Sequence, residues 1–152
     1  MNVAVIGGFK CSRKFYKCAY ELGRLIAQKG WILVCGGRTG VMEAACKGAK
    51  EKGGLTVGIL PSVSGEDANA YVDIKIPTGL GYARNILVVR AVDIVIAVDG
   101  KYGTLSEIAF AFNENKPVIG IDTWEIKGII KVKTPGQAIK KCETLRKSQL
   151  IF

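Results

Sequence analysis

The sequence predicts a single α/β domain, a three-layer sandwich in which helices cover both faces of a mainly parallel sheet. Short apolar runs alternate with longer segments of helical character along the chain, and glycine-containing turns separate them. This alternation makes successive strands parallel, because each helix carries the chain back across the sheet. The 152 residues are 49% hydrophobic and include 19 glycines, which suits one compact core with many tight turns. We therefore expect residues 1–152 to form one domain without internal repeats.

Several short apolar runs are expected to form strands, because each is bounded by glycine, proline or polar turn residues. The expected strands are residues 2–6, 31–35, 55–60, 72–76, 94–98 and 117–121. The polar stretch 61–70 predicts a loop.

Helices are expected between these strands. Ser12 is placed to cap a helix that continues to about residue 28, where Gly30 ends it. Segment 82–92 is ambiguous: Ile-Leu-Val-Val at 86–89 favours a strand, but its place between two strands favours a buried helix, which we expect. The other expected helices are residues 39–52, 104–113 and 135–147.

The composition excludes several classes of chemistry. Histidine is absent, which removes Ser-His-Asp and Cys-His catalysis and most zinc sites, so we expect no metal site. The five cysteines form no C-x-x-C pattern, and their odd number argues against a disulfide framework. Acid–base chemistry would therefore fall to carboxylates, lysine, tyrosine or cysteine.

The net charge of +9 favours an anionic partner, such as a nucleotide, another phosphorylated metabolite or nucleic acid. The basic residues also fit a solvated surface, and no recognisable nucleic-acid module accompanies them, so we expect a small ligand. The longest apolar run, around 86–98, is interrupted by Arg90 and Asp93, and no signal peptide precedes the first strand. We expect a cytoplasmic protein that does not cross a membrane.

Three glycine-containing loops directly follow expected strands, so they meet at one edge of a parallel sheet. Glycine allows a backbone to turn with positive φ and to approach a ligand closely, and the N–H groups at the start of a helix attract phosphate. Any one loop fits an ordinary α/β turn, but all three together predict a phosphate pocket. The loop residues are Gly7 and Gly8; Gly36, Gly37, Arg38, Thr39 and Gly40; and Gly100, Lys101, Tyr102, Gly103 and Thr104.

The common nucleotide fingerprints are absent. No G-x-G-x-x-G follows the first strand, no acidic residue ends the second, and the chain contains no G-x-x-x-x-G-K-[ST]. The sequence thus predicts a Rossmann-like sheet without an ordinary NAD or ATP site.

Three motifs carry a resemblance to a known family. Segment 99–107 reads D-G-K-Y-G-T-L-S-E, Arg84 opens the segment before the fifth strand, and G-G-R-T-G-V-M occupies 36–42. With these motifs the chain resembles the LOG-like phosphoribohydrolases, whose pattern is P-G-G-x-G-T-x-x-E, and the related molybdenum-cofactor carrier proteins. The resemblance extends from the first strand to about Trp124.

The resemblance implies two alternative functions. As a hydrolase, the chain would cleave the N-glycosidic bond of a nucleoside 5′-monophosphate to a base and ribose 5-phosphate. Arg84 and Glu107 would be catalytic, with Glu107 stabilising positive charge on the ribose and Arg84 orienting the substrate. As a non-catalytic carrier or sensor, it would hold a nucleotide-like ligand such as molybdenum cofactor. Neither function requires a resident cofactor.

Two departures from the hydrolase pattern favour binding over turnover. D-G-K replaces P-G-G, and Asn85 follows Arg84 where the hydrolases usually have lysine, a form closer to the carriers. Simpler roles also compete: Thr104 and Glu107 fit a helix capping box, Arg84 fits an exposed salt bridge, and Lys101 fits a pair with Asp99, which we favour.

The apolar run beside Arg90, with Phe110 and Phe112 on the next expected helix, predicts a helix that needs a second surface to cover it. The related families form dimers through such helices, which implies a homodimer or a higher homo-oligomer. Burial within the monomer is the alternative.

Overall fold

The computed structural model describes residues 1–149, so residues 150–152 of the expected domain lie outside the described residues. Its seven strands form one parallel sheet in the order β4-β3-β2-β1-β5-β6-β7. The strands are β1 (Asn2–Gly7), β2 (Ile32–Cys35), β3 (Thr56–Leu60), β4 (Ile74–Pro77), β5 (Ile94–Val98), β6 (Val118–Ile121) and β7 (Ile130–Val132). The helices are α1 (Arg13–Gln28), α2 (Val41–Glu51), the 3₁₀ helix η1 (Gly81–Arg84), α3 (Asn85–Arg90), α4 (Tyr102–Asn113) and α5 (Pro135–Gln149).

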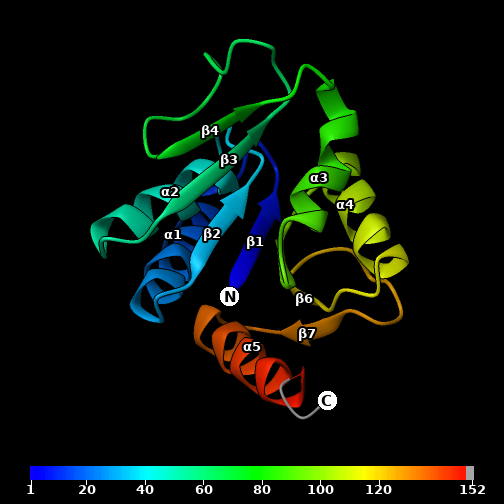
Figure 1. Ribbon diagram of the computed structural model, residues 1–152. Coiled ribbons are helices and arrows are strands. Elements are labelled where there is room, and N and C mark those ends of the chain that lie inside the picture. The colour runs from blue at the N-terminus through cyan, green and yellow to red at the C-terminus, as the bar shows by residue number, and fades with distance from the viewer. Residues whose placement is uncertain (150–152) are drawn as a thin grey trace.

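The helices form a layer on each face of the sheet, which confirms the predicted Rossmann-like three-layer fold (Figure 1). Helices α1, α2 and α5 pack on one face, around Leu22, Ile26 and Cys142. Helices α3 and α4 pack on the other, around Val88 and Ile108. The chain builds outward from β1 to β4 and then returns to place β5 on the other side of β1. The sheet therefore reverses its direction of growth between β1 and β5, the place where open α/β sheets bind ligands.

Helices α1 and α2 approach each other through two glycines. A Cβ atom on Gly23 would lie 1.9 Å from the carbonyl oxygen of Ala45, and one on Gly48 would lie 1.9 Å from that of Tyr20. Helix α1 begins as expected, with the Ser12 side chain accepting a hydrogen bond from the Phe15 amide at 3.4 Å. This packing fixes α2, and with it the loop between β2 and α2.

Most expected elements are confirmed, and the differences have local causes. The ambiguous segment 82–92 is helical, divided into η1 and α3, with Val88 and Val89 fully buried. Strand β7 was not expected, because Ile-Lys-Val is too short to stand out and lies at the edge of the sheet. Within residues 1–149, no helix is both long and apolar enough to cross a membrane.

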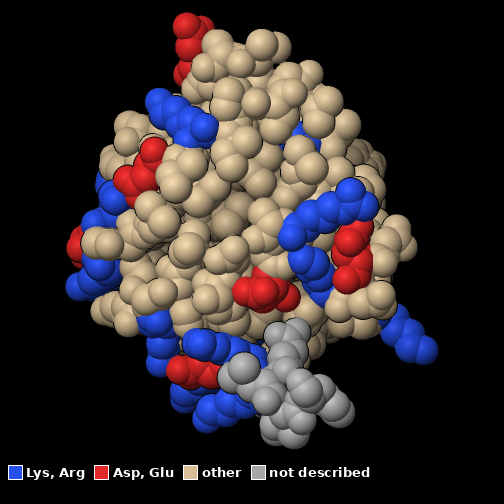
Figure 2. Space-filling model, viewed as in Figure 1, with Lys and Arg blue, Asp and Glu red and all other residues tan. Residues whose placement is uncertain are grey.

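The charged side chains are unevenly distributed over the surface. Lysine and arginine gather around α5, at the bottom of the view, whereas the upper central part of the same face is largely uncharged (Figure 2). The exposed apolar residues Ile74 and Ile76 belong to β4, and Leu80 lies just before η1.

Candidate functional site

A cavity of about 460 Å³ opens at the carboxyl edge of the sheet, where β1 and β5 meet. Its walls come from the loops after β1 and β2, the junction of η1 and α3, and the first two turns of α4. The lining residues are Ile6, Gly7, Gly8, Phe9, Lys10, Gly36, Arg38, Met42, Tyr82, Arg84, Asn85, Lys101, Tyr102, Gly103, Thr104, Ser106 and Glu107.

The structure brings most of the expected site residues to this cavity, including both Arg84 and Glu107. Four glycine-loop residues, Gly37, Thr39, Gly40 and Gly100, are not among those that line it. They shape the loops instead: the Thr39 hydroxyl donates to the Phe9 carbonyl at 2.8 Å, and Gly100 has a φ of 102° that turns the chain into α4.

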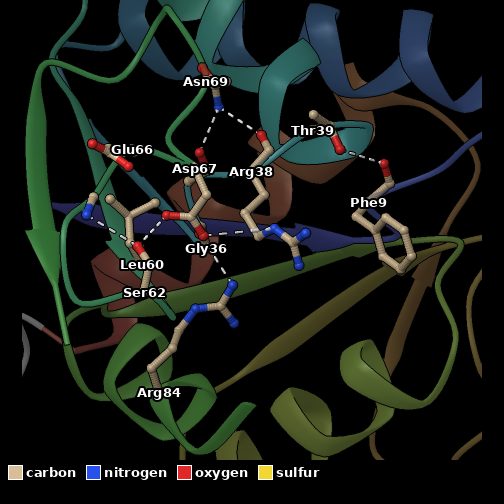
Figure 3. A network of polar contacts seen from close by, with 12 residues as sticks. Phe9, Gly36, Arg38, Thr39, Leu60, Ser62, Glu66, Asp67, Asn69 and Arg84 are labelled. Carbon is tan, nitrogen blue, oxygen red and sulfur yellow. Dashed lines mark hydrogen bonds and ion pairs between the residues drawn. The ribbon is translucent and has the colours of Figure 1, made fainter. Parts of the chain in front are cut away.

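Arg84 is a buried cation on the cavity wall, only 7% exposed, so the alternative of an exposed salt bridge is wrong. Its Nη2 donates to the Gly36 carbonyl at 3.2 Å, and its Nη1 donates to Oδ1 of Asn85 (Figure 3 shows the first contact). Its Nε is buried and has no hydrogen-bond partner among residues 1–149. In residues 1–149 no carboxylate lies within ion-pair distance of Arg84. Burial lowers the Arg84 pKa, although an arginine remains charged.

Glu107 is a buried acid that also lines the cavity, 7% exposed. Its carboxyl group forms no hydrogen bond or ion pair with other described residues. Burial raises the pKa of Glu107 to about 8, and the charge of Arg84 only partly opposes that shift. Near neutral pH, Glu107 is therefore mainly a neutral carboxylic acid that can donate a hydrogen bond.

The alternative of a capping box at Thr104 and Glu107 is wrong. Helix α4 begins at Tyr102, two residues earlier than expected, and its N-cap is Lys101, which forms no side-chain capping bond. Thr104 is therefore the third residue of the helix and Glu107 the sixth, whereas a capping box needs the threonine at the N-cap and the glutamate at the third residue. The side chain of Glu107 is left to face the cavity.

The first turn of α4 forms the third wall. The leading N–H groups of a helix lack partners within the helix and carry partial positive charge, so they attract anions. Asp99, at φ 50°, and Gly100 make the turn that aims this end of α4 at the cavity. The expected Lys101–Asp99 ion pair is absent from the described residues, and the Lys101 side chain is exposed at the cavity wall.

A polar network from the loop after β3 holds the second glycine loop in place (Figure 3). Nδ2 of Asn69 donates to the Arg38 carbonyl at 2.8 Å, and Asp67 lies 4.0 Å from Nε of Arg38. The Arg38 guanidinium also lies over the Phe9 ring, 5.5 Å from its centroid. Arg38 is therefore held at the cavity by contacts from two other loops.

Seven lining residues were not expected at the site: Ile6, Phe9, Lys10, Met42, Tyr82, Asn85 and Ser106. Phe9 and Lys10 directly follow the first glycine loop, which is a signal that sequence reasoning could have used. Ser106 lies between Thr104 and Glu107 in the motif at 99–107, which is also such a signal, and in the structure its hydroxyl accepts from Nδ2 of Asn85 at 2.9 Å.

The comparisons with known proteins agree with the fold. The chain is 39% identical to the molybdenum cofactor binding protein of Rippkaea orientalis, with a TM-score of 0.87, covering 95% of this chain and 94% of that one. It is 34% identical to the molybdenum cofactor carrier protein of Chlamydomonas reinhardtii, also with a TM-score of 0.87, covering 96% and 98%.

A relative with a hydrolase name matches over a shorter region. The chain is 34% identical to the cytokinin riboside 5′-monophosphate phosphoribohydrolase of Mycobacterium tuberculosis over 115 residues, which are 70% of this chain and 62% of that protein. The model of the SLOG cluster4 family matches residues 1–148. On this match, and on the resemblance to both groups, the chain belongs to the SLOG cluster4 family.

Proposed function

We propose that the cavity binds a small phosphorylated, nucleotide-like ligand. The observation that carries this proposal is Arg84, a buried cation with no carboxylate within ion-pair distance in residues 1–149. A buried charge without a counter-ion is costly, and an anionic ligand would relieve that cost. The ligand phosphate would lie between Arg84 and the first turn of α4.

The other lining groups support an anionic, partly planar ligand. Lys10, Arg38 and Lys101 add positive charge to the walls, while Glu107 stays mainly neutral near pH 7. Tyr82 and Tyr102 are 77% and 80% exposed. Exposed aromatic rings next to cations suit a flat heterocycle that carries phosphate.

We favour binding without turnover, with molybdenum cofactor as the carried ligand. The two relatives named for that cofactor match nearly the whole chain, whereas the hydrolase match covers 62% of the relative. The unpartnered Nε of Arg84 and the cations on the cavity wall suit a phosphorylated cofactor. Here Glu107 would donate a hydrogen bond to the ligand.

Hydrolysis of a nucleoside 5′-monophosphate is the second candidate, because Arg84 and Glu107 line the same cavity. A protonated Glu107 is suited to give its proton to the departing base, while Arg84 holds the sugar phosphate. This reaction yields the free base and ribose 5-phosphate, with water supplying the new C1′ hydroxyl group.

One experiment separates the two functions. Purified protein is incubated with a panel of nucleoside 5′-monophosphates, and NMR follows ligand binding, free base and ribose 5-phosphate. Binding without product release supports a carrier, as does molybdenum cofactor that copurifies with the wild type and not with Arg84→Met. Product release that disappears in Glu107→Gln supports the hydrolase. If the wild type binds none of these nucleotides and no cofactor copurifies with it, the proposed ligand class is contradicted.

We further propose that the protein is a cytoplasmic homodimer or higher homo-oligomer. Ile74 and Ile76 of β4 are 46% and 43% exposed. Their partners in register on β3, Val57 and Ile59, belong instead to the core cluster that includes α3. Parallel sheets are usually covered on both faces, so a second copy would cover the exposed apolar side chains of β4. The five free cysteines support a reducing compartment.

A further inference from the structure

Asn85 is the residue that connects Arg84 to helix α4. It is 2% exposed and lies at the start of α3. Its Nδ2 donates to Oγ of Ser106 at 2.9 Å and to the Gly103 carbonyl at 3.4 Å, and its Oδ1 accepts from Nη1 of Arg84. Asn85 therefore joins the buried cation to the first two turns of α4.

Only one orientation of the Asn85 amide satisfies these neighbours. The Gly103 carbonyl can only accept, and the Ser106 hydroxyl donates its proton to that carbonyl at 2.6 Å, so it presents a lone pair to Asn85. The guanidinium of Arg84 can only donate. The NH₂ group of Asn85 must therefore face α4, and its oxygen must face Arg84.

We propose that Asn85 is a positioning residue: its neutral oxygen holds the Arg84 guanidinium in the cavity and leaves the charge of Arg84 for the ligand. The Gly36 carbonyl, 3.2 Å from Nη2, is the second neutral support. A carboxylate at position 85 would still accept a hydrogen bond from the guanidinium but would neutralise its charge, and it could not donate to the Gly103 carbonyl. The part of this inference that concerns ligand binding rests on the proposed function.

The first test needs no ligand. In protein with ¹⁵N-labelled arginine, a guanidinium held from two sides rotates slowly, so wild-type Arg84 should show separate Nη signals, assigned by their loss in Arg84→Lys. Asn85→Ala should average or shift them, whereas Asn85→Asp should keep them separate. Asn113→Ala, at an exposed asparagine at the end of α4, is the matched control. If Asn85→Ala does not fold, Ser106→Ala, which removes one acceptor of Nδ2, carries the same comparison.

The second test titrates inorganic phosphate and adenosine 5′-monophosphate. Asn85→Ala and Asn85→Asp should each weaken binding by about tenfold or more, since a hydrogen bond to a charged group contributes that much. In an Arg84→Met background, Asn85→Ala should have no further effect.

The outcomes separate the two claims. Wild-type Arg84 signals in Asn85→Ala would overturn the positioning role, and wild-type phosphate affinity in Asn85→Asp would overturn the need for a neutral oxygen. Absence of binding by the wild type, with Arg84 signals that respond to Asn85→Ala, would overturn the proposed ligand class and leave the positioning role supported.

Discussion

Replacement of Glu107 by glutamine should make the protein more stable, and increasingly so as the pH rises. The carboxyl group is 7% exposed, and burial raises its pKa from 4.5 to about 8. Over this interval the unfolded chain has lost the Glu107 proton and the folded chain still holds it. The free energy of unfolding of the wild type therefore falls as the pH rises from about 4.5 to about 8 and levels off above that range.

The size of this effect follows from the shift. Each pKa unit corresponds to about 1.36 kcal/mol, so the full penalty in the wild type is at most roughly 5 kcal/mol. Glutamine has nearly the same shape and does not titrate, so Glu107→Gln avoids this penalty. The two proteins should differ little near pH 5 and by several kcal/mol above about pH 8.

Urea unfolding of both proteins across this pH range measures the difference directly, and other titrating groups cancel in the comparison. Glu66→Gln is the matched control, because Glu66 is exposed and its side chain forms no hydrogen bond or ion pair within residues 1–149. A Glu107→Gln protein whose stability follows the wild-type pH profile would refute the assignment of Glu107 as a buried, neutral acid.

The other predictions concern the ligand, the core and the assembly. Arg84→Met should fold and lose binding of adenosine 5′-monophosphate by about a hundredfold in a titration, since it removes the buried cation; unchanged affinity would contradict the proposed site. Gly23→Ala should destabilise the fold by about 3 kcal/mol or more in urea unfolding, because the new Cβ would lie 1.9 Å from the Ala45 carbonyl. Gly136→Ala, in α5 with no atom near its Cβ, should be neutral or slightly stabilising, and equal effects at both glycines would count against the helix contact. Ile76→Asp should convert the proposed oligomer into monomers in light scattering, since it charges the exposed edge of the sheet; a wild-type monomer would contradict that assembly.

Local pattern was a good guide to the elements and a poor guide to their ends. The apolar run 94–98 was predicted with the bounds that β5 has, because a strand buried on both faces shows as an unbroken apolar segment. The start of α4 was misplaced by two residues, and this shift is why Thr104 and Glu107 resembled a capping box. The position of a helix cap depends on the turn before the helix, here Asp99 and Gly100 at positive φ. Such a turn does not change the spacing of apolar residues from which the helix was predicted.

The alternation of strands and helices alone already implied a parallel sheet, one edge that collects the glycine loops, and an anion site at that edge. These features follow from the spacing of apolar residues within each segment and from the alternation of strands with helices, both of which can be read directly along the sequence. The burial of Arg84, the lack of a carboxylate to pair with it in residues 1–149, and the neutral state of Glu107 were decided by tertiary structure. They depend on the placement of β5 beside β1, which brings Gly36, Arg84 and Glu107 around one cavity. Desolvation and pairing act through space, so residues far apart in the chain set the charge of this site.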